Sequence, residues 1–143
     1  MATATIYLDG DVQVGWNTST GANHYGAINE GTAAPNDSTY IEVTTPDAVD
    51  EWSFGPVPAN VDTVTQWDFK VRGRITDSSA ASYYSVELWH TGGAVKVGAT
   101  KTISVADLGG SGMLGTVTLS WTGLTLTKAQ ADSMTAKVIF KVA

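Results

Sequence analysis

The sequence predicts an all-β protein, an antiparallel β-sandwich of jelly-roll type, and three features lead to that prediction. One long stretch alternates strictly between apolar and polar residues, threonine and glycine are abundant, and short apolar runs recur between turn residues. Threonine favours strands and glycine favours turns. Runs at this spacing are typical of an antiparallel sandwich, and long crossing loops favour a jelly roll. We expect about eight strands and one short helix near the C-terminus, in a single domain of residues 1–143.

The alternating stretch runs from Val64 to Ile75. Its apolar parity holds Trp67, Phe69, Val71, Gly73 and Ile75, and its polar parity holds Gln66, Asp68, Lys70, Arg72 and Arg74. A period of two residues indicates a β-strand with one dry and one wet face. We therefore expect a central strand of a two-layer domain, with a basic outer surface at Lys70, Arg72 and Arg74.

Four strands are expected in the first half of the chain, at residues 3–8, 12–16 and 39–44 and as a short strand centred on Trp52 and Phe54 within 47–55. Asp9-Gly10-Asp11 is expected to form a tight turn between the first two, because glycine tolerates positive φ and aspartate bonds to its own backbone. The polar residues 17–37 are predicted to form a long loop, and loops of that length are often functional. Trp16, Tyr25 and Ile28 are expected to anchor this loop to the core.

The second half is expected to contain a hairpin, in which residues 77–81 join the alternating strand to an antiparallel partner at 82–90. Further strands are predicted at 94–105, 116–126 and 137–142. Gly98 is expected to form a bulge in the first of them. Residues 127–134 are the best helix candidate, with Thr127 as the N-cap.

Charge is distributed unevenly along the chain, whose net charge is −6. All eight basic residues follow residue 62. The acidic residues that precede it are Asp9, Asp11, Glu30, Asp37, Glu42, Asp47, Asp50, Glu51 and Asp62. Either the two halves interleave in space so that their charges mix, or the subunit is bipolar and its acidic and basic surfaces meet in neighbouring copies. In both cases nucleic-acid binding is disfavoured, because phosphate contacts need a net basic footprint.

Several protein classes are disfavoured by what the sequence lacks. It contains no cysteine, which excludes disulfides and thiolate metal sites. The N-terminus has neither the basic nor the apolar region of a secretory signal, and no apolar run reaches the length of a membrane span. We therefore expect a soluble protein made in the cytoplasm, with no membrane partner.

We expect no enzymatic activity and no cofactor. The two histidines, His24 and His90, fall in the polar loop and at a strand end, and no G-x-S-x-G motif supports a serine nucleophile. The acidic residues fall mostly in turns, as turn chemistry alone would place them, so a pair of glycosidase carboxylates is disfavoured. Asp9, Asp11 and Asp37 are weak candidates for a Ca²⁺ site, but the EF-hand pattern is absent and a plain turn is the better interpretation.

Five tryptophans make a carbohydrate-binding module the main alternative to a protein-binding domain. Trp67 and Trp121 share their parity with aliphatic neighbours and are expected in the core. Tyr83 and Trp89 fall opposite the aliphatic parity of their strand and are the best candidates for an exposed aromatic pair. Such a pair marks a protein interface at least as often as a ligand site.

The stretch from Asp9 to Ile41 reads DGDVQVGWNTSTGANHYGAINEGTAAPNDSTYI. It resembles a group of small phage and prophage virion-associated proteins, which carry a GDV…GW-x-x-S/T-T-G…Y-x-A-I-x-E…DDS-x-YI pattern and end in L-T-x-A-Q-A-D before a final strand. Asn29 and Asn36 stand where the group commonly has aspartate. The matching residues are Gly10-Asp11-Val12, Gly15-Trp16, Ser19-Thr20-Gly21, Tyr25, Ala27-Ile28, Glu30, Asp37-Ser38, Tyr40-Ile41, Leu126-Thr127 and Ala129-Gln130-Ala131-Asp132.

The resemblance implies a β-sandwich structural protein of the virion, without catalytic residues. On this basis we expect a capsid decoration (cement) protein that binds the major capsid protein, copies of itself, or both, as a homo-oligomer on the virion. The alternatives are a carbohydrate-binding module, a host-adhesion or fibre domain, and a tail or baseplate accessory domain. The residues expected at the interface are Trp16, Asn23, His24, Tyr25, Glu30, Lys70, Arg72, Arg74, Tyr83 and Trp89.

Overall fold

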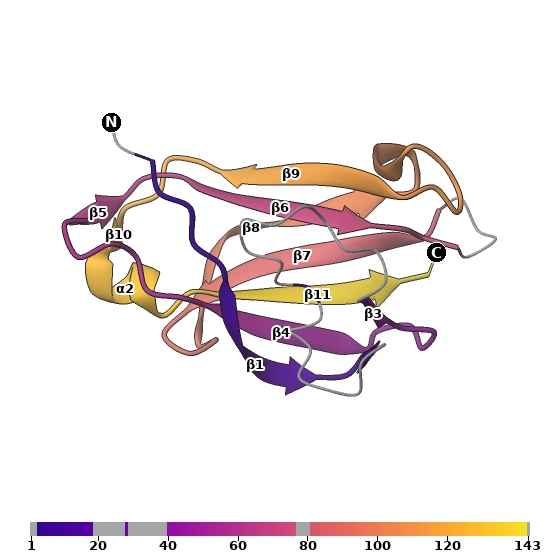
Figure 1. Ribbon diagram of the computed structural model, residues 1–143, viewed down its shortest axis with the longest axis horizontal. Coiled ribbons are helices and arrows are strands. Elements are labelled where there is room, and N and C mark those ends of the chain that lie inside the picture. The colour runs from indigo at the N-terminus through magenta and orange to yellow at the C-terminus, as the bar shows by residue number, and fades with distance from the viewer. Residues whose placement is uncertain (1–2, 19–27, 29–39, 77–80, 143) are drawn as a thin grey trace.

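The computed structural model describes residues 3–18, 28, 40–76 and 81–142 (Figure 1). Strands account for 52% of these residues and the paired strands run antiparallel, so the prediction of an all-β protein is confirmed. The elements are β1 (Leu8–Val14), β2 (Asn17–Thr18), β3 (Ile41–Glu42), β4 (Val49–Phe54), β5 (Thr63–Val64), β6 (Trp67–Gly73), β7 (Tyr83–His90), β8 (Val95–Ser104), the 3-10 turn η1 (Ala106–Leu108), β9 (Gly115–Trp121), β10 (Leu126–Thr127), the helix α2 (Lys128–Asp132) and β11 (Thr135–Lys141).

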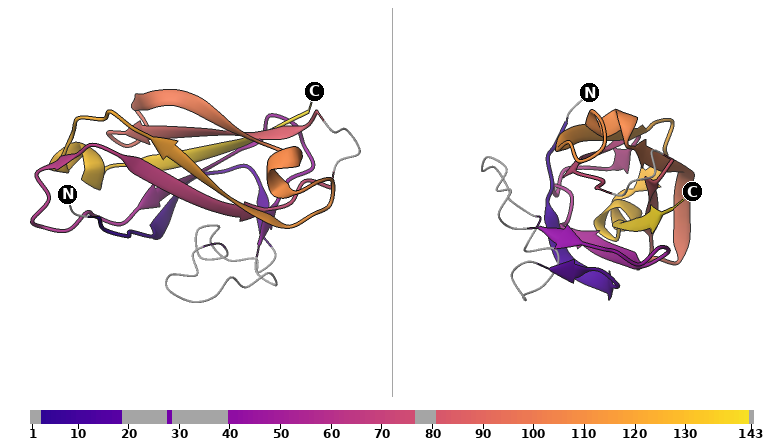
Figure 2. Two further views of the ribbon diagram at one scale, coloured as in Figure 1. Left: turned by 90° about the horizontal axis from the view of Figure 1, so that it is seen from above. Right: turned by 90° about the vertical axis from the view of Figure 1, so that its right-hand side faces the viewer.

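Five strands form the main sheet, in the order β1-β4-β11-β7-β8, and β6 pairs with β9 in a separate two-stranded ribbon. The ribbon lies over one face of the main sheet (Figure 2). Two short pairs, β2–β3 and β5–β10, complete the strand pairing of the described residues. The alternating stretch is therefore a ribbon strand, and the prediction that it is a central strand is wrong for the described part of the chain. Alternation of apolar and polar residues shows which side chains are buried, but it does not show which strands pair.

The predicted faces of β6 are confirmed. Trp67 and Phe69 are buried, while Lys70, Arg72 and Arg74 on the other parity are exposed. The strand itself is shorter than the alternating stretch, because residues 63 and 64 belong to β5 and pair with β10 instead.

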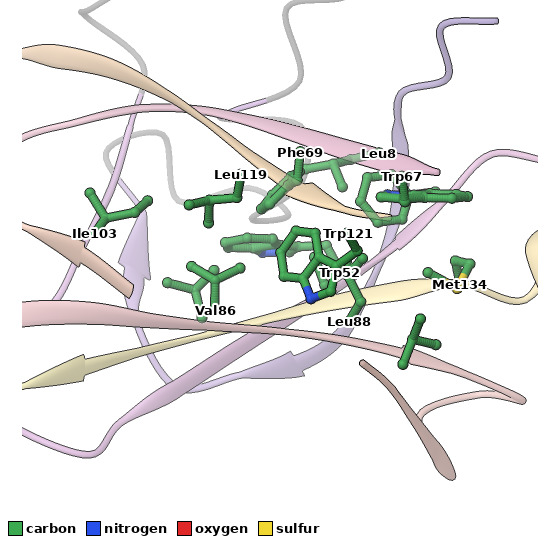
Figure 3. Packing of buried hydrophobic residues seen from close by; sticks show 14 of the residues in the cluster. Leu8, Trp52, Trp67, Phe69, Val86, Leu88, Ile103, Leu119, Trp121 and Met134 are labelled. Atoms are coloured by element: carbon green, nitrogen blue, oxygen red, sulfur yellow. The ribbon is translucent and has the colours of Figure 1, made fainter. Parts of the chain in front are cut away.

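The core fills the space between the main sheet and the ribbon (Figure 3). Trp67 of β6 and Trp121 of β9 lie in it, as predicted, and both are less than one tenth exposed. The ring of Phe54 on β4 makes edge-on contacts with Trp67 and Phe69, with ring centroids 5.1 and 5.7 Å apart. Edge-to-face packing of this kind adds stability beyond the burial of area. These three rings join the two layers.

The predicted hairpin between the alternating strand and residues 82–90 is wrong. β7 pairs with β11 on one side and with β8 on the other. Its aliphatic face is as predicted, since Val86 and Leu88 are fully buried. Turn residues between two strands predict that the chain reverses, but not that both strands stay in one sheet. Here β6 and β7 lie in different layers.

The predicted turn at residues 9–11 is also wrong, because these residues lie inside β1. The register of β1 against β4 shifts twice, between Leu8 and Gly10 and between Asp11 and Gln13. Such bulges accommodate an extra residue without ending the strand. The turn-forming residues therefore bend the strand instead of reversing the chain.

The helix prediction is confirmed, with Thr127 as the N-cap of α2. Thr127 Oγ1 accepts a hydrogen bond from the Gln130 backbone N–H at 3.2 Å, and Gln130 Oε1 accepts one from the Thr127 backbone N–H at 2.9 Å. This reciprocal pair is a capping box. Asp132 accepts from the backbone N–H of Val57 at 2.9 Å and from Lys128 Nζ at 2.7 Å. The hydrogen bond from Lys128 holds the pKa of Asp132 below its usual value.

The predicted bulge at Gly98 is confirmed. The register between β7 and β8 shifts between Val86 and Leu88, and Gly98 has a φ of +64°. The indole of Trp121 fits against this bulge, and its Nε1 donates to the carbonyl of Ala99 at 2.8 Å. A Cβ atom on Gly98 would lie 2.9 Å from Trp121 Cδ1. The bulge therefore connects an edge of the main sheet to the ribbon.

We expect Gly98→Ala to lower the free energy of unfolding by about 2–3 kcal/mol, because the new Cβ meets both a left-handed backbone and the Trp121 ring. Gly123→Ala is the matched control, since Gly123 has a φ of +67° and nothing lies within 4 Å of the added Cβ. The control should cost only about 1 kcal/mol. Denaturant unfolding of both variants measures the difference. Equal losses would show that the contact with Trp121 contributes nothing.

Candidate binding surface

The outer face of the ribbon carries a row of three cations beside a row of hydroxyl groups. Lys70 and Arg72 on β6 lie opposite Thr118 and Thr116 on β9, and Arg74 follows just beyond β6. Arg72 Nη1 lies 3.5 Å from Thr116 Oγ1. Side chains on one face of a strand recur about every 7 Å. The ribbon thus presents an exposed surface of net positive charge with regular spacing, on which Asp68 is the one acidic residue of β6.

A groove of about 2080 Å³ runs beside this row (Figure 1 shows the neighbouring segments). One wall is formed by residues 63–76, which include β6, and every residue of that range lines the groove. The facing walls are residues 3–8 and 40–44. Because side chains of both parities of β6 line it, the groove follows the edge of the strand rather than either face.

Aromatic and aliphatic side chains from the main sheet form the floor of the groove. Phe54 and Phe140 line it from β4 and β11, and Tyr84 lines it from β7. Tyr84 stacks at a tilt against Trp16 and Phe140, with ring centroids 5.7 and 6.0 Å apart. Its hydroxyl donates to the carbonyl of Arg74, which ties the floor to the basic row.

Burial raises the pKa of Tyr84 to about 12. An unfolded tyrosine titrates near 10, so between pH 10 and 12 the unfolded chain ionises while the folded one stays neutral. The contribution of the neutral Tyr84 hydroxyl to the free energy of unfolding is fully present below pH 10 and is lost as the pH rises to 12. We expect the free energy of unfolding to fall by about 2 kcal/mol over this window. Tyr84→Phe should reduce that fall, and an unchanged slope in alkaline unfolding experiments would contradict this assignment.

Trp16 anchors its segment to the core, as predicted. The backbone N–H groups of Gly15 and Trp16 donate to Asp50 Oδ1 at 2.8 and 3.0 Å, and the Trp16 indole donates to the carbonyl of Ala48 at 3.0 Å. Asp50 Oδ2 accepts from Trp52 Nε1 at 3.1 Å. Trp16 is only 9% exposed. Its side chain belongs to the core, and its expected role at the interface stays a prediction.

Tyr83 and Trp89 lie on the outer face of the main sheet, away from the ribbon. They are partly exposed, but they stand at opposite ends of β7, about 20 Å apart, and do not form a pair. Lys137 Nζ lies 4.7 Å from the centre of the Trp89 ring, and the Trp89 indole donates to Glu87 Oε1 at 3.2 Å. Burial raises the pKa of Glu87, but hydrogen bonds from Trp89 and Thr100 and the charge of Lys96 outweigh it and leave the pKa lowered.

The structure also bears on the metal and membrane expectations. Asp9 accepts a hydrogen bond from Ser53 Oγ at 2.8 Å. Among the described residues, no three His, Cys, Asp or Glu side chains gather where they could hold a metal ion. No helix within the described ranges has the length and apolar character needed to cross a membrane. Five residues of the predicted interface or metal site lie outside the described residues: Asn23, His24, Tyr25, Glu30 and Asp37.

Sequence reasoning missed the buried acidic residues of β4. Asp50 is fully buried, and Glu51 is 4% exposed and accepts from Thr135 Oγ1 at 2.6 Å. Asp47 forms an ion pair with Lys141. The signal that could have revealed them is the position of Asp50 and Glu51 inside a strand whose other residues are largely apolar, where a buried charge needs internal partners. The acidic half of the sequence is therefore not one acidic surface.

The fold and this surface together define an all-β protein of antiparallel sheets with a basic ribbon and an adjoining groove. Comparisons of the chain with protein-family models, with curated proteins and with solved structures gave no match. Its function has to be inferred from the described surface and from the sequence.

Proposed function

We propose that this chain is a non-enzymatic structural protein of a phage virion, most simply a capsid decoration protein that binds the head surface through protein–protein contacts. The resemblance at residues 9–41 and 126–132 supports the virion assignment. The observation that carries the binding assignment is the exposed row of Lys70, Arg72 and Arg74 along the two-stranded ribbon. A complementary acidic patch on the shell would be the partner surface.

The finer fold that we propose is a sandwich of jelly-roll type. In the described chain, successive long strands change layer between β4 and β6, between β6 and β7, between β8 and β9, and between β9 and β11. Repeated crossing between two layers is the connectivity of jelly rolls and other Greek-key folds. The Gly98 bulge that receives Trp121 supports the same arrangement, because it joins the layers along one side.

Adhesion alone would let such a protein stabilise a shell. A subunit that binds the assembled lattice and not the free shell protein shifts the equilibrium toward assembly by mass action. Display of many copies on a lattice makes a weak contact effective through avidity. No reaction, cofactor or membrane is required. The shell protein, neighbouring copies of this chain, or both would supply the contacts.

Reversal of two charges tests this function. We expect Arg72→Glu/Arg74→Glu to lose at least tenfold in occupancy on purified capsids that lack the protein, because two attractive contacts become repulsive. Co-sedimentation with the capsids gives the occupancy. Lys96→Glu/Lys101→Glu makes the same change in net charge on β8 and should bind as the parent does. If Arg72→Glu/Arg74→Glu reached full occupancy, the basic row would be ruled out as the capsid-binding surface.

The carbohydrate-binding alternative would use Trp89. The ring of Trp89 already lies beneath Lys137, and its indole N–H already has an acceptor in Glu87, so a sugar would have to displace Lys137. A glycan array with the parent and Trp89→Ala separates the two functions. A sugar-dependent signal that disappears in the variant would favour the carbohydrate function over the decoration function.

A further inference from the structure

Four of the longer described strands lie at the margins of their sheets: β1 and β8 in the main sheet, and β6 and β9 in the ribbon. β9 packs against β8 and η1, since Trp121 Nε1 donates to the carbonyl of Ala99 at 2.8 Å and a Cβ atom on Gly115 would lie 2.5 Å from the carbonyl oxygen of Leu108. β1 and β8 are the outer strands of the main sheet, and both carry register shifts. Bulges of this kind protect edges from pairing with a further strand. β6 pairs with β9 in unbroken register over seven residues, and β9 is its only partner strand within the described ranges. β6 is therefore the edge that is geometrically able to receive a strand.

The groove along β6 is too large for an ordinary small ligand. Small-molecule sites occupy roughly 300–1,000 Å³, and this groove is about 2080 Å³. It is also elongated, since it follows residues 63–76 along their whole length. An extended chain segment matches both its size and its shape.

The two sides of β6 define the chemistry of such a segment. Toward the floor lie the rings of Phe54, Phe69 and Phe140, which would receive apolar side chains. Toward the outside lie Lys70 and Arg74, which are exposed and would attract acidic side chains. Because successive side chains of a strand point to opposite faces, the segment that fits has alternating apolar and acidic residues.

We propose that the edge of β6, over Trp67–Val71, is a strand-acceptor site for an extended segment of a partner protein that alternates apolar and acidic residues. The segment would add beside β6 and extend the ribbon by one strand, with main-chain hydrogen bonds for affinity and alternate side chains for specificity. That the partner is a protein rests on the proposed function. That the partner segment binds as an added strand rests on the groove and on the unbroken register of β6.

A labelled synthetic peptide that alternates valine and aspartate tests the site. We expect it to bind the full-length protein by fluorescence anisotropy. We also expect it to slow hydrogen exchange at least tenfold for the Trp67–Val71 amides that do not donate to β9, with no comparable change in β1 or β8. A peptide of the same composition with its valines and aspartates in two separate blocks should not bind, because its side chains cannot divide between the two faces.

Charge variants locate the peptide. Lys70→Glu/Arg74→Glu should weaken binding of the alternating peptide at least about tenfold. Lys96→Glu/Lys101→Glu carries the same net charge and should bind it as the parent does. Lys70 and Arg74 are exposed, whereas Lys101 is half-buried with its Nζ 5.8 Å from the centre of the Trp121 ring and Lys96 pairs with Glu87 at 3.5 Å. Matching far-ultraviolet circular dichroism and matching denaturant midpoints will confirm that both variants are folded.

Several outcomes would overturn the site. These are equal binding of the peptide with separate blocks, slow exchange in the free protein of those Trp67–Val71 amides that do not donate to β9, and protection by the alternating peptide on another strand. Concentration-dependent self-association that the peptide blocks would assign the groove to a second copy and reject the partner segment. Capsid binding that persists without peptide binding would overturn this inference alone. Absent capsid binding with intact peptide binding would overturn only the proposed function.

Discussion

Gly15→Ala is expected to lower the free energy of unfolding by about 3 kcal/mol or more. A Cβ atom at this position would lie 2.4 Å from the carbonyl oxygen and 2.9 Å from the amide nitrogen of Val49. Both are backbone atoms of β4, which is held between β1 and β11 and cannot move aside. Overpacking against a rigid neighbour costs about 1–3 kcal/mol, and more when the obstacle is backbone. A loss of this size lowers the thermal midpoint by roughly 10 °C.

Gly55→Ala is the matched control for Gly15→Ala. Its added Cβ would meet its nearest neighbour, the carbonyl oxygen of Tyr7, at an ordinary contact distance of 3.5 Å. This control should change stability by less than about 1 kcal/mol. Calorimetry on both variants compares them directly. If Gly15→Ala were as mild as Gly55→Ala, the close approach of residue 15 to β4 would not exist in solution.

The sequence predicted the faces of the strands better than their partners. The alternation from Val64 to Ile75 correctly separates buried from exposed side chains, because that separation depends on local parity alone. It could not show that β6 pairs with β9, or that β11 inserts between β4 and β7. Those pairings join residues far apart in the chain, and many registers satisfy the same alternation. Local capping was predictable for the same reason as parity, since Thr127 and Gln130 are three residues apart.

The candidate surface was predictable only in part. The basic row follows directly from the spacing of Lys70, Arg72 and Arg74, whereas the groove depends on wall segments and floor strands that are far apart in the chain and meet only in the fold. The excess of acidic residues in the first half of the sequence suggested a larger acidic surface than the structure has. Asp50 and Glu51 count in the sequence as acidic charge, yet both are buried and serve internal hydrogen bonds. A linear count of charges cannot tell a surface charge from an internal acceptor.

Two of the motifs that carry the family resemblance have a structural role here. In the Gly-Trp pair, Gly15 allows close approach to β4 and Trp16 fills the core. In the L-T-x-A-Q-A-D motif, Thr127 caps α2 and Asp132 holds the backbone of Val57. These residues support the fold, and the surface that we propose for a partner lies elsewhere, on the ribbon and its groove.

Asp50→Ala is the second change with a large expected effect, and it should lower the free energy of unfolding by about 3–5 kcal/mol. The Asp50 carboxylate is fully buried and accepts from the backbone N–H groups of Gly15 and Trp16 and from Trp52 Nε1. Its removal leaves the Trp16 N–H and Trp52 Nε1 buried without this acceptor and the Gly15 N–H part-buried. Each buried donor without an acceptor costs about 1–3 kcal/mol. Asp47→Ala is the control, because Asp47 is exposed and its ion pair with Lys141 is worth at most about 1 kcal/mol.

Asp50→Asn separates the charge of this group from its shape. The amide oxygen can still accept from Gly15 and Trp16, but the amide nitrogen then faces Trp52 Nε1, so two donors oppose each other. We expect a loss of about 2–3 kcal/mol, between those of Asp47→Ala and Asp50→Ala, in denaturant unfolding. The double variant Gly15→Ala/Asp50→Ala should lose less than the sum of its single changes, because both disrupt the same junction of β1 and β4. Full additivity would mean that the carboxylate and the glycine act independently, and that Asp50 does not hold residues 15 and 16 against the sheet.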